Sequence, residues 1–280
     1  TRWSKMYSGF ITSKRSVSAV GVHQRFNKVS YKMIESFLAN GSFPSITQIN
    51  HFEGINGPDG LKTKSPGENE PSHLYDPYDD DGPIPDLINT HYNLLVKKLK
   101  DRDMIGSAFE AAWLSHFVVD GLTPAHHFPL DKHLQEHGFK KNERGRYVVE
   151  RKGLTHIDIV RKAWKVVGGK GLLTTHFNFE MGVATVILGQ KIRVKLDCSK
   201  MADARQDGPI GFFKKEALEI AEMNLYEKFY RYGWTPEIAR KTKGKLAPKI
   251  VQDVGIIWLL AYLESGEELV KDVVAKEVVA

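Results

Sequence analysis

The segment MIGSAFEAAWLSHFVVDGLTPAH, residues 104–126, decides the fold class of this protein. From Met104 to Val119 it is largely apolar around the whole circumference of a helix, which is typical of a buried central helix. Gly121 ends the periodic pattern and Pro124 follows, as is usual just after a helix C-terminus. We therefore expect a central helix and a tight turn behind it.

Helical periodicity extends over most of the remaining chain. Between Asp86 and Lys100, apolar side chains such as Leu87, Leu95 and Leu99 recur on one face. Further helices are expected at about 157–167, 176–194, 212–232 and 250–265. Strand signal is thin, and its best candidate is 146–150, which predicts a small basic hairpin within 138–152. The expected fold class is all-α: a single-domain multi-helix protein over residues 1–280.

Residues 40–86 differ from the rest of the chain because they are rich in Gly, Pro, Asn and Asp. Turn signals such as Asn40-Gly41 and Asp81-Gly82-Pro83 recur through this region. We expect one long ordered loop, a feature that is uncommon in globular chains and is usually functional.

Composition narrows the function classes. With 280 residues, 41% hydrophobic and 26% charged, the chain has the make-up of a globular protein. The formal net charge of +6 favours an anionic partner such as nucleic acid or a lipid surface, but it also fits solubility alone. A single cysteine, Cys198, excludes an intrachain disulfide and a thiolate-rich zinc finger. Any bound metal must therefore be held by histidines and carboxylates.

Two His–carboxylate pairs carry the chemistry. His116 and Asp120 are four residues apart on the central helix, so both can reach a common ion, and the following turn brings His126 back toward them. His176 and Glu180 repeat the same spacing further along the chain. A single pair of this kind is more often a buried histidine that is hydrogen-bonded to a carboxylate than a metal site. Two pairs in apolar sequence indicate metal ions, because zinc takes three or four N/O ligands and buried carboxylates are costly without a cation.

With the loop segment Ser72-His73-Leu74-Tyr75-Asp76-Pro77, these motifs resemble the zinc-dependent phospholipase C family, whose superfamily also contains single-strand-specific zinc nucleases. That family shows, in chain order, an N-terminal Trp, an early His, Gly-Ile-x3-Asp, Ser-His-x-Tyr-Asp-Pro, His-x3-Asp-x5-His and His-x3-Glu. The matching residues here are Trp3, His23, Gly54-Ile55 to Asp59, Ser72 to Pro77, His116/Asp120/His126 and His176/Glu180.

The resemblance implies a helical bundle that binds up to three zinc ions. Asp59, His73, His116 and Asp120 would hold the first ion. His126, His176 and Glu180 would hold the second. Asp120 would bridge to a third ion that is shared with His23 and the N-terminal residue, taken as Trp3. Asp59 would also act as the catalytic general base.

The implied activity is phosphodiester hydrolysis of the phospholipase C type, in which a zinc-bound hydroxide releases diacylglycerol and a phosphorylated headgroup. The expected partner is therefore a phospholipid or a membrane surface, and the family implies an exported protein, secreted or periplasmic. The start of the chain, Thr1 to Lys5, lacks the apolar core of a signal peptide, which fits either a cytosolic protein or a mature exported chain whose signal has been removed. We expect a monomer.

Three departures from the family leave alternatives open. Thr1 and Arg2 precede Trp3, residues 138–152 belong to a large insertion between His126 and His176, and Gly60 and Glu70 stand where choline-pocket aromatics are expected. The resemblance to the family therefore supports the metal site better than it supports the substrate. One alternative is a single-strand-specific zinc nuclease, with nucleic acid as substrate. Another is a zinc-retaining, membrane-binding relative without turnover.

Overall fold

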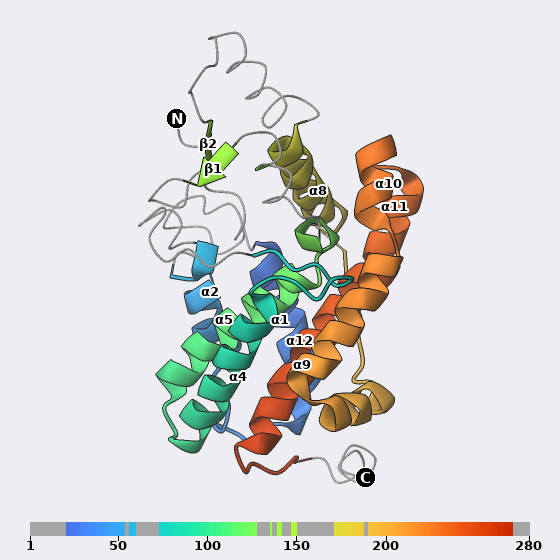
Figure 1. Cartoon of the computed structure of the whole chain (residues 1–280). Coiled ribbons are helices and arrows are strands. Elements are labelled where there is room, and N and C mark those ends of the chain that lie inside the picture. The colour runs from blue at the N-terminus through green and yellow to red at the C-terminus, as the bar shows by residue number, and fades with distance from the viewer. Residues whose placement is uncertain are drawn as a thin grey trace, which may run out of the picture.

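The computed structural model describes residues 21–53, 56–59, 73–127, 135, 139–141, 147–149, 171–187 and 190–270. Within these residues the protein is one all-α helical body, as the sequence predicts (Figure 1). Trp3 and the helix expected at 157–167 lie outside the described residues, as do Gly54, Ile55, Gly60, Glu70 and Ser72.

The helix α5, Met104–Gly121, lies at the centre of the core. Asp103 caps its N-terminus by accepting a hydrogen bond from the Gly106 N–H at 2.8 Å. The helix α4, Ile84–Lys100, packs along α5, and α2, Ile46–Glu53, and α1, Val22–Ile34, cover other sides of it. Burial around the whole helix explains why the segment is apolar on every face.

A second buried helix, α12, Ala247–Glu264, also lies in the core (Figure 1). The Trp258 indole N–H donates to the Ala111 carbonyl of α5 at 3.0 Å, and the Ser30 hydroxyl of α1 donates to the Val251 carbonyl at 2.7 Å. Together with the short α11, Pro236–Lys241, and the π-helical turn η3, Thr242–Leu246, it forms a continuous segment that is apolar and long enough to span a membrane. Because 78% of the most apolar window is buried inside the protein, it has the character of a core helix.

Helix α9, Cys198–Glu222, is kinked at Gly208 and Pro209 and packs against α12. A buried charge network joins the two helices: Lys200 Nζ lies 2.5 Å from Glu216 Oε2 and 3.3 Å from Asp253 Oδ1. Burial raises the pKa of Asp253 well above 3.8, and its contact with Lys200 offsets part of the cost of burying this carboxyl between the two helices.

The remaining described helices are α8, Leu172–Ile187, and α10, Leu225–Tyr232. Two 3₁₀ turns complete the element order: η1, Glu35–Phe37, follows α1, and η2, Pro124–His127, follows α5. The strands β1, Phe139–Lys141, and β2, Tyr147–Val149, form an antiparallel pair. This pair confirms the hairpin that was expected within 138–152.

Three boundary predictions are wrong. The stretch 40–86 is not a loop throughout, because α2 forms within it at Ile46–Glu53. The helix expected at 176–194 ends at Ile187. In the extended segment that follows, the partly buried Ile192, Val194 and Leu196 alternate with exposed basic residues, which is the period of a strand and not of a helix. The helix expected at 212–232 is two helices, because Asn224 adopts a left-handed conformation (φ 53°) between α9 and α10.

Candidate metal centre

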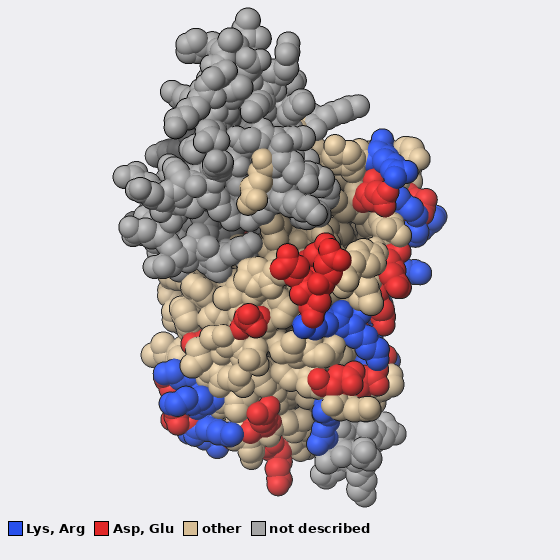
Figure 2. All heavy atoms as spheres, in the orientation of Figure 1, with Lys and Arg blue, Asp and Glu red and all other residues tan. Residues whose placement is uncertain are grey.

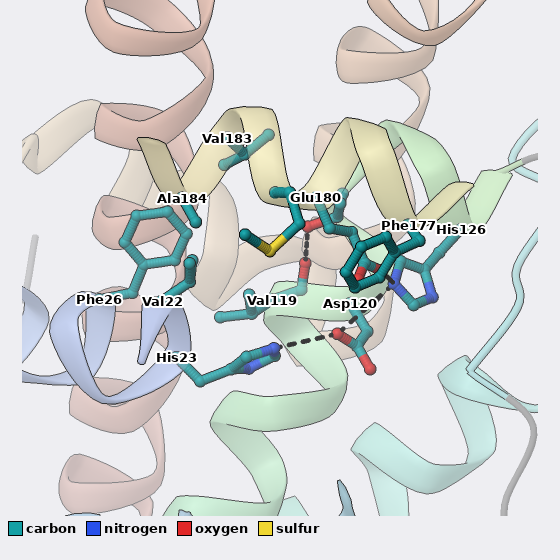
Figure 3. A pocket seen from close by; sticks show the side chains of 12 residues that line it. Val22, His23, Phe26, Val119, Asp120, His126, Phe177, Glu180, Val183 and Ala184 are labelled. Carbon is teal, nitrogen blue, oxygen red and sulfur yellow. Dashed lines mark hydrogen bonds and ion pairs between the residues drawn. The ribbon is translucent and has the colours of Figure 1, made fainter. Parts of the chain in front are cut away.

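The sequence-predicted ligands converge where α1, α5 and α8 meet the turn after α5. His23 comes from the first turn of α1, His116 and Asp120 from α5, His126 from η2, and His176 and Glu180 from α8. Asp59 and His73 lie within the 40–86 region. Figure 3 shows His23 pointing from α1 toward Asp120, with Glu180 and His126 on the other side.

Three groups of these residues could hold metal ions, and two of the groups share His116. Within each group the donor atoms lie within 4.8 Å of one another. The groups are His23/Asp59/His116, His73/His116/Asp120 and His126/His176/Glu180. The last group matches a ligand set implied by the resemblance. In the structure Asp59 groups with His23 as well as with His116. The ligands of the first and third ions are therefore divided differently from the sets that the resemblance implies.

Asp120 is the centre of the cluster. Its Oδ1 lies 3.3 Å from His23 Nε2 and 3.8 Å from His126 Nε2. Its Oδ2 lies 3.2 Å from His116 Nε2 and contacts His73 Nδ1. Because its two oxygens face different histidines, this one carboxylate can bridge two ions.

The His126 group is built by two segments that bond to each other. The His126 Nδ1–H donates to the His73 carbonyl at 2.6 Å, and the Tyr75 N–H donates to the His126 carbonyl at 3.0 Å. His126 Nε2 therefore faces Glu180 Oε1, which lies 2.9 Å away, and His176 Nε2 lies 3.0 Å from the same oxygen. Two ring nitrogens and a carboxylate at this separation suit one zinc ion.

In this cluster, burial and neighbouring charges shift the pKa values of the side chains in opposite directions. Burial by itself would lower the pKa of His116, but the carboxylates of Asp120, Glu53 and Asp59 outweigh it and raise the pKa well above the ordinary 6.5. Burial would raise the pKa of Asp120, but His116 and His126 outweigh it and hold that pKa well below 3.8. Without a metal, the carboxylates thus favour the protonated form of the His116 ring.

The same balance applies at the His126 group. Burial opposes charge on His126, yet Asp120 and Glu180 raise its pKa above 6.5. Burial likewise opposes charge on Glu180, yet His176 and His126 lower its pKa below 4.5. The neighbouring His127 behaves differently, because burial lowers its pKa to about 4 and its Nε2–H donates to the Gly121 carbonyl at 2.7 Å. His127 therefore stabilises the end of α5 as a neutral ring.

The donor set fits zinc. All the donors are imidazole nitrogens and carboxylate oxygens, the ligands that zinc takes in the absence of thiolates. His116 is 0% exposed and Asp120 5% exposed, so their charges need a counter-charge inside the protein.

Sequence reasoning missed Glu53, the last residue of α2. It is 0% exposed, and its Oε1 accepts a hydrogen bond from the His116 Nδ1–H at 2.8 Å. No spacing pattern marks it, because it lies in the region expected to be a loop and its partner is 63 residues away.

In sequence, Asp76 to Asp81 can be read as a calcium loop, but Gly and Glu do not fall at the spacing of an EF-hand. Here Asp76 Oδ1 accepts the Tyr78 N–H at 2.9 Å, and Asp80 accepts the Tyr75 hydroxyl at 2.9 Å and pairs with Lys214. These carboxylates are occupied in shaping the loop, so they do not converge as a cation site.

In comparisons with known proteins, no family model and no curated protein matches this sequence.

Proposed function

We propose that this protein is a zinc-dependent phosphodiester hydrolase, and that it acts as a phospholipase C. The observation that carries the proposal is the convergence of His and carboxylate donors from separate segments around Asp120. The donor order along the chain is the one found in the zinc-dependent phospholipase C family.

Zinc ions in such a cluster acidify a water molecule and neutralise charge on a phosphate. We propose that Asp59 acts on that water. Its side chain is 9% exposed at the edge of the cluster, with Oδ1 3.9 Å from His116 Nε2. We assign it the role of general base, which accepts the proton from the attacking water while the other donors hold the metals.

A lipid substrate is supported by the apolar wall beside the donors. The cavity that contains His23, Asp120, His126 and Glu180 is otherwise lined mainly by apolar side chains from α1, α5 and α8 (Figure 3). These side chains are Val22, Phe26, Val119, Phe177, Met181, Val183 and Ala184. The cavity measures about 50 Å³, so it supports an apolar contact beside the metal donors and not the enclosure of a whole lipid chain.

A nuclease is the second candidate, and one feature favours it. A hollow of about 770 Å³ lies between α8 and the segment 229–234, lined by Phe229, Tyr230, Tyr232 and Trp234. Single-stranded nucleic acid binds by stacking bases on such rings. Charge adds little support, because on the face drawn in Figure 2 the described Lys and Arg residues lie interspersed with Asp and Glu.

The deciding experiment offers zinc-loaded protein two substrates side by side, phospholipid micelles and single-stranded DNA, with and without chelator. We expect chelator-sensitive release of diacylglycerol. The matched variant is Tyr232→Ala, which removes a ring that is 72% exposed in the aromatic hollow. It should leave lipid hydrolysis unchanged.

DNA cleavage that falls in Tyr232→Ala would instead establish the nuclease. No turnover of either substrate by zinc-loaded protein would leave the zinc-retaining, membrane-binding protein. Export from the cell and a monomeric state belong to the same proposal, and cell fractionation and light scattering test them.

A further inference from the structure

Two ligand histidines on different helices share one buried carboxylate behind them. Glu53 Oε1 accepts the His116 Nδ1–H at 2.8 Å and lies 3.5 Å from His23 Nδ1. Glu53 is fully buried at the end of α2, which packs against both α1 and α5. Among the described residues, its other oxygen, Oε2, has no hydrogen-bond partner, so Oε1 makes the contacts to the two rings.

The two rings form a stacked pair. Their centroids are 4.4 Å apart and their planes differ by 17°. At the edges opposite Glu53, His23 Nε2 lies 3.3 Å from Asp120 Oδ1 and His116 Nε2 lies 3.2 Å from Asp120 Oδ2. The pair is therefore held between two carboxylates, with Glu53 behind it and Asp120 on the side of the metal donors.

The hydrogen bond to Glu53 selects the tautomer of His116, whereas His23 Nδ1 makes no hydrogen bond within the described part of the chain and is favoured as the protonated nitrogen by the charge of the same carboxylate 3.5 Å away. A neutral imidazole carries one proton, and a ring that places it on Nδ1 toward Glu53 leaves the Nε2 lone pair directed at the cluster. Carboxylates that hold ligand histidines in this way orient the ring and increase its basicity. Because one carboxylate serves two rings, its effect reaches two metal positions together.

We propose that Glu53 is a positioning residue that orients His23 and His116 as Nε2 ligands and so couples the two ions that they bind. The proposal rests on the metal centre proposed above, but not on any particular substrate. The ion held by His126, His176 and Glu180 lies outside this coupling, because none of those side chains contacts Glu53 in the contacts described above.

The test is Glu53→Gln in the full chain, titrated with zinc in competition with a chelating dye, with native mass spectrometry to count bound ions. We expect 10–100-fold weaker binding of the ions that use His23 and His116. Binding at His126/His176/Glu180 should change less than about twofold.

The chain offers a matched control in Glu110, a buried glutamate whose Oε2 accepts the His91 Nδ1–H at 2.7 Å between α5 and α4. Glu110→Gln removes the same kind of charge away from the ligands, so zinc affinities should stay at the wild-type values. Three results would each overturn the proposal. In Glu53→Gln, the affinity for all the ions could fall equally, or it could not fall at all. Alternatively, Glu110→Gln could lower the zinc affinities as much as Glu53→Gln does.

A second measurement needs no variant. In nitrogen-15 histidine spectra of the zinc-loaded wild-type protein, His23 and His116 should carry their protons on Nδ1, and the opposite tautomer would overturn the proposal. Zinc binding and substrate turnover are separate readouts. A wild-type protein that binds zinc but cleaves no phosphodiester would refute the proposed function and leave the Glu53 titration decisive.

Discussion

At the scale of single residues, Asp59 separates catalysis from metal binding. As general base it must accept a proton, which an amide cannot do. We expect Asp59→Asn to lower phosphodiester hydrolysis by roughly 10²–10⁴-fold. Zinc content should largely persist, because the other donors around Asp120 remain. Kinetics and metal analysis on the same preparation check this prediction.

A suitable control for that variant is Asp79→Asn, an exposed acidic residue of the neighbouring loop. It should leave both activity and zinc unchanged. If activity in Asp59→Asn falls only in proportion to lost zinc, Asp59 is a ligand and the base lies elsewhere.

At the scale of elements, α8 carries His176 and Glu180, and Trp234 holds α8 against α10. The Trp234 ring stacks on Phe179 with centroids 5.4 Å apart, and its indole N–H donates to the Asn178 carbonyl at 3.2 Å. Gly182 makes this approach possible, because a Cβ there would lie 1.8 Å from the Trp234 ring.

We expect Gly182→Ala to displace the Trp234 ring and to destabilise the protein by roughly 1–3 kcal/mol through overpacking. Thermal unfolding and tryptophan fluorescence measure the effect. Gly244→Ala is the control, since a Cβ at Gly244 meets nothing within 4 Å, and it should not lower stability. An unchanged melting temperature in Gly182→Ala would contradict the packing described here.

At the scale of the whole molecule, stability should depend on pH in opposite ways in the zinc-free and the zinc-bound protein. In the metal-free protein the pKa values of His116 and His126 are raised above 6.5. Their contribution to stability is complete below pH 6.5 and is lost as the pH rises through the folded-state pKa values. Asp120 and Glu180 have lowered pKa values, so their contribution is present above the ordinary 3.8 and 4.5 and is lost on acidification below that range.

With chelator, we therefore expect the melting temperature to fall as pH rises above 6.5. With zinc it should rise over the same interval, because ligand histidines must be neutral to bind the metal. The measurement is the melting temperature as a function of pH from pH 5 to pH 9, once with chelator and once with zinc. Titrating groups remote from the cluster, such as Asp253, contribute equally to both curves, so their contribution drops out of the difference. Parallel curves would mean that these histidines do not bind zinc.

The sequence by itself determined the all-α class, because apolar residues around the whole of 104–119 demand burial on every side. It also determined the pairs His116/Asp120 and His176/Glu180, because the four-residue spacing on a helix is a local property. The extended segment at 192–196 was predictable in principle, since its alternation has the period of a strand.

The family resemblance implied that His23, Asp59 and His73 meet these pairs, but only the tertiary structure shows the contacts by which they do so. His23, Asp59 and His73 reach Asp120 and His116 through the packing of α1 and α2 on α5 and through the bond between Tyr75 and His126. Glu53 joined them for the same reason. Helical periodicity repeats every few residues, whereas a metal centre depends on contacts between segments that are tens of residues apart, and no local pattern encodes those contacts.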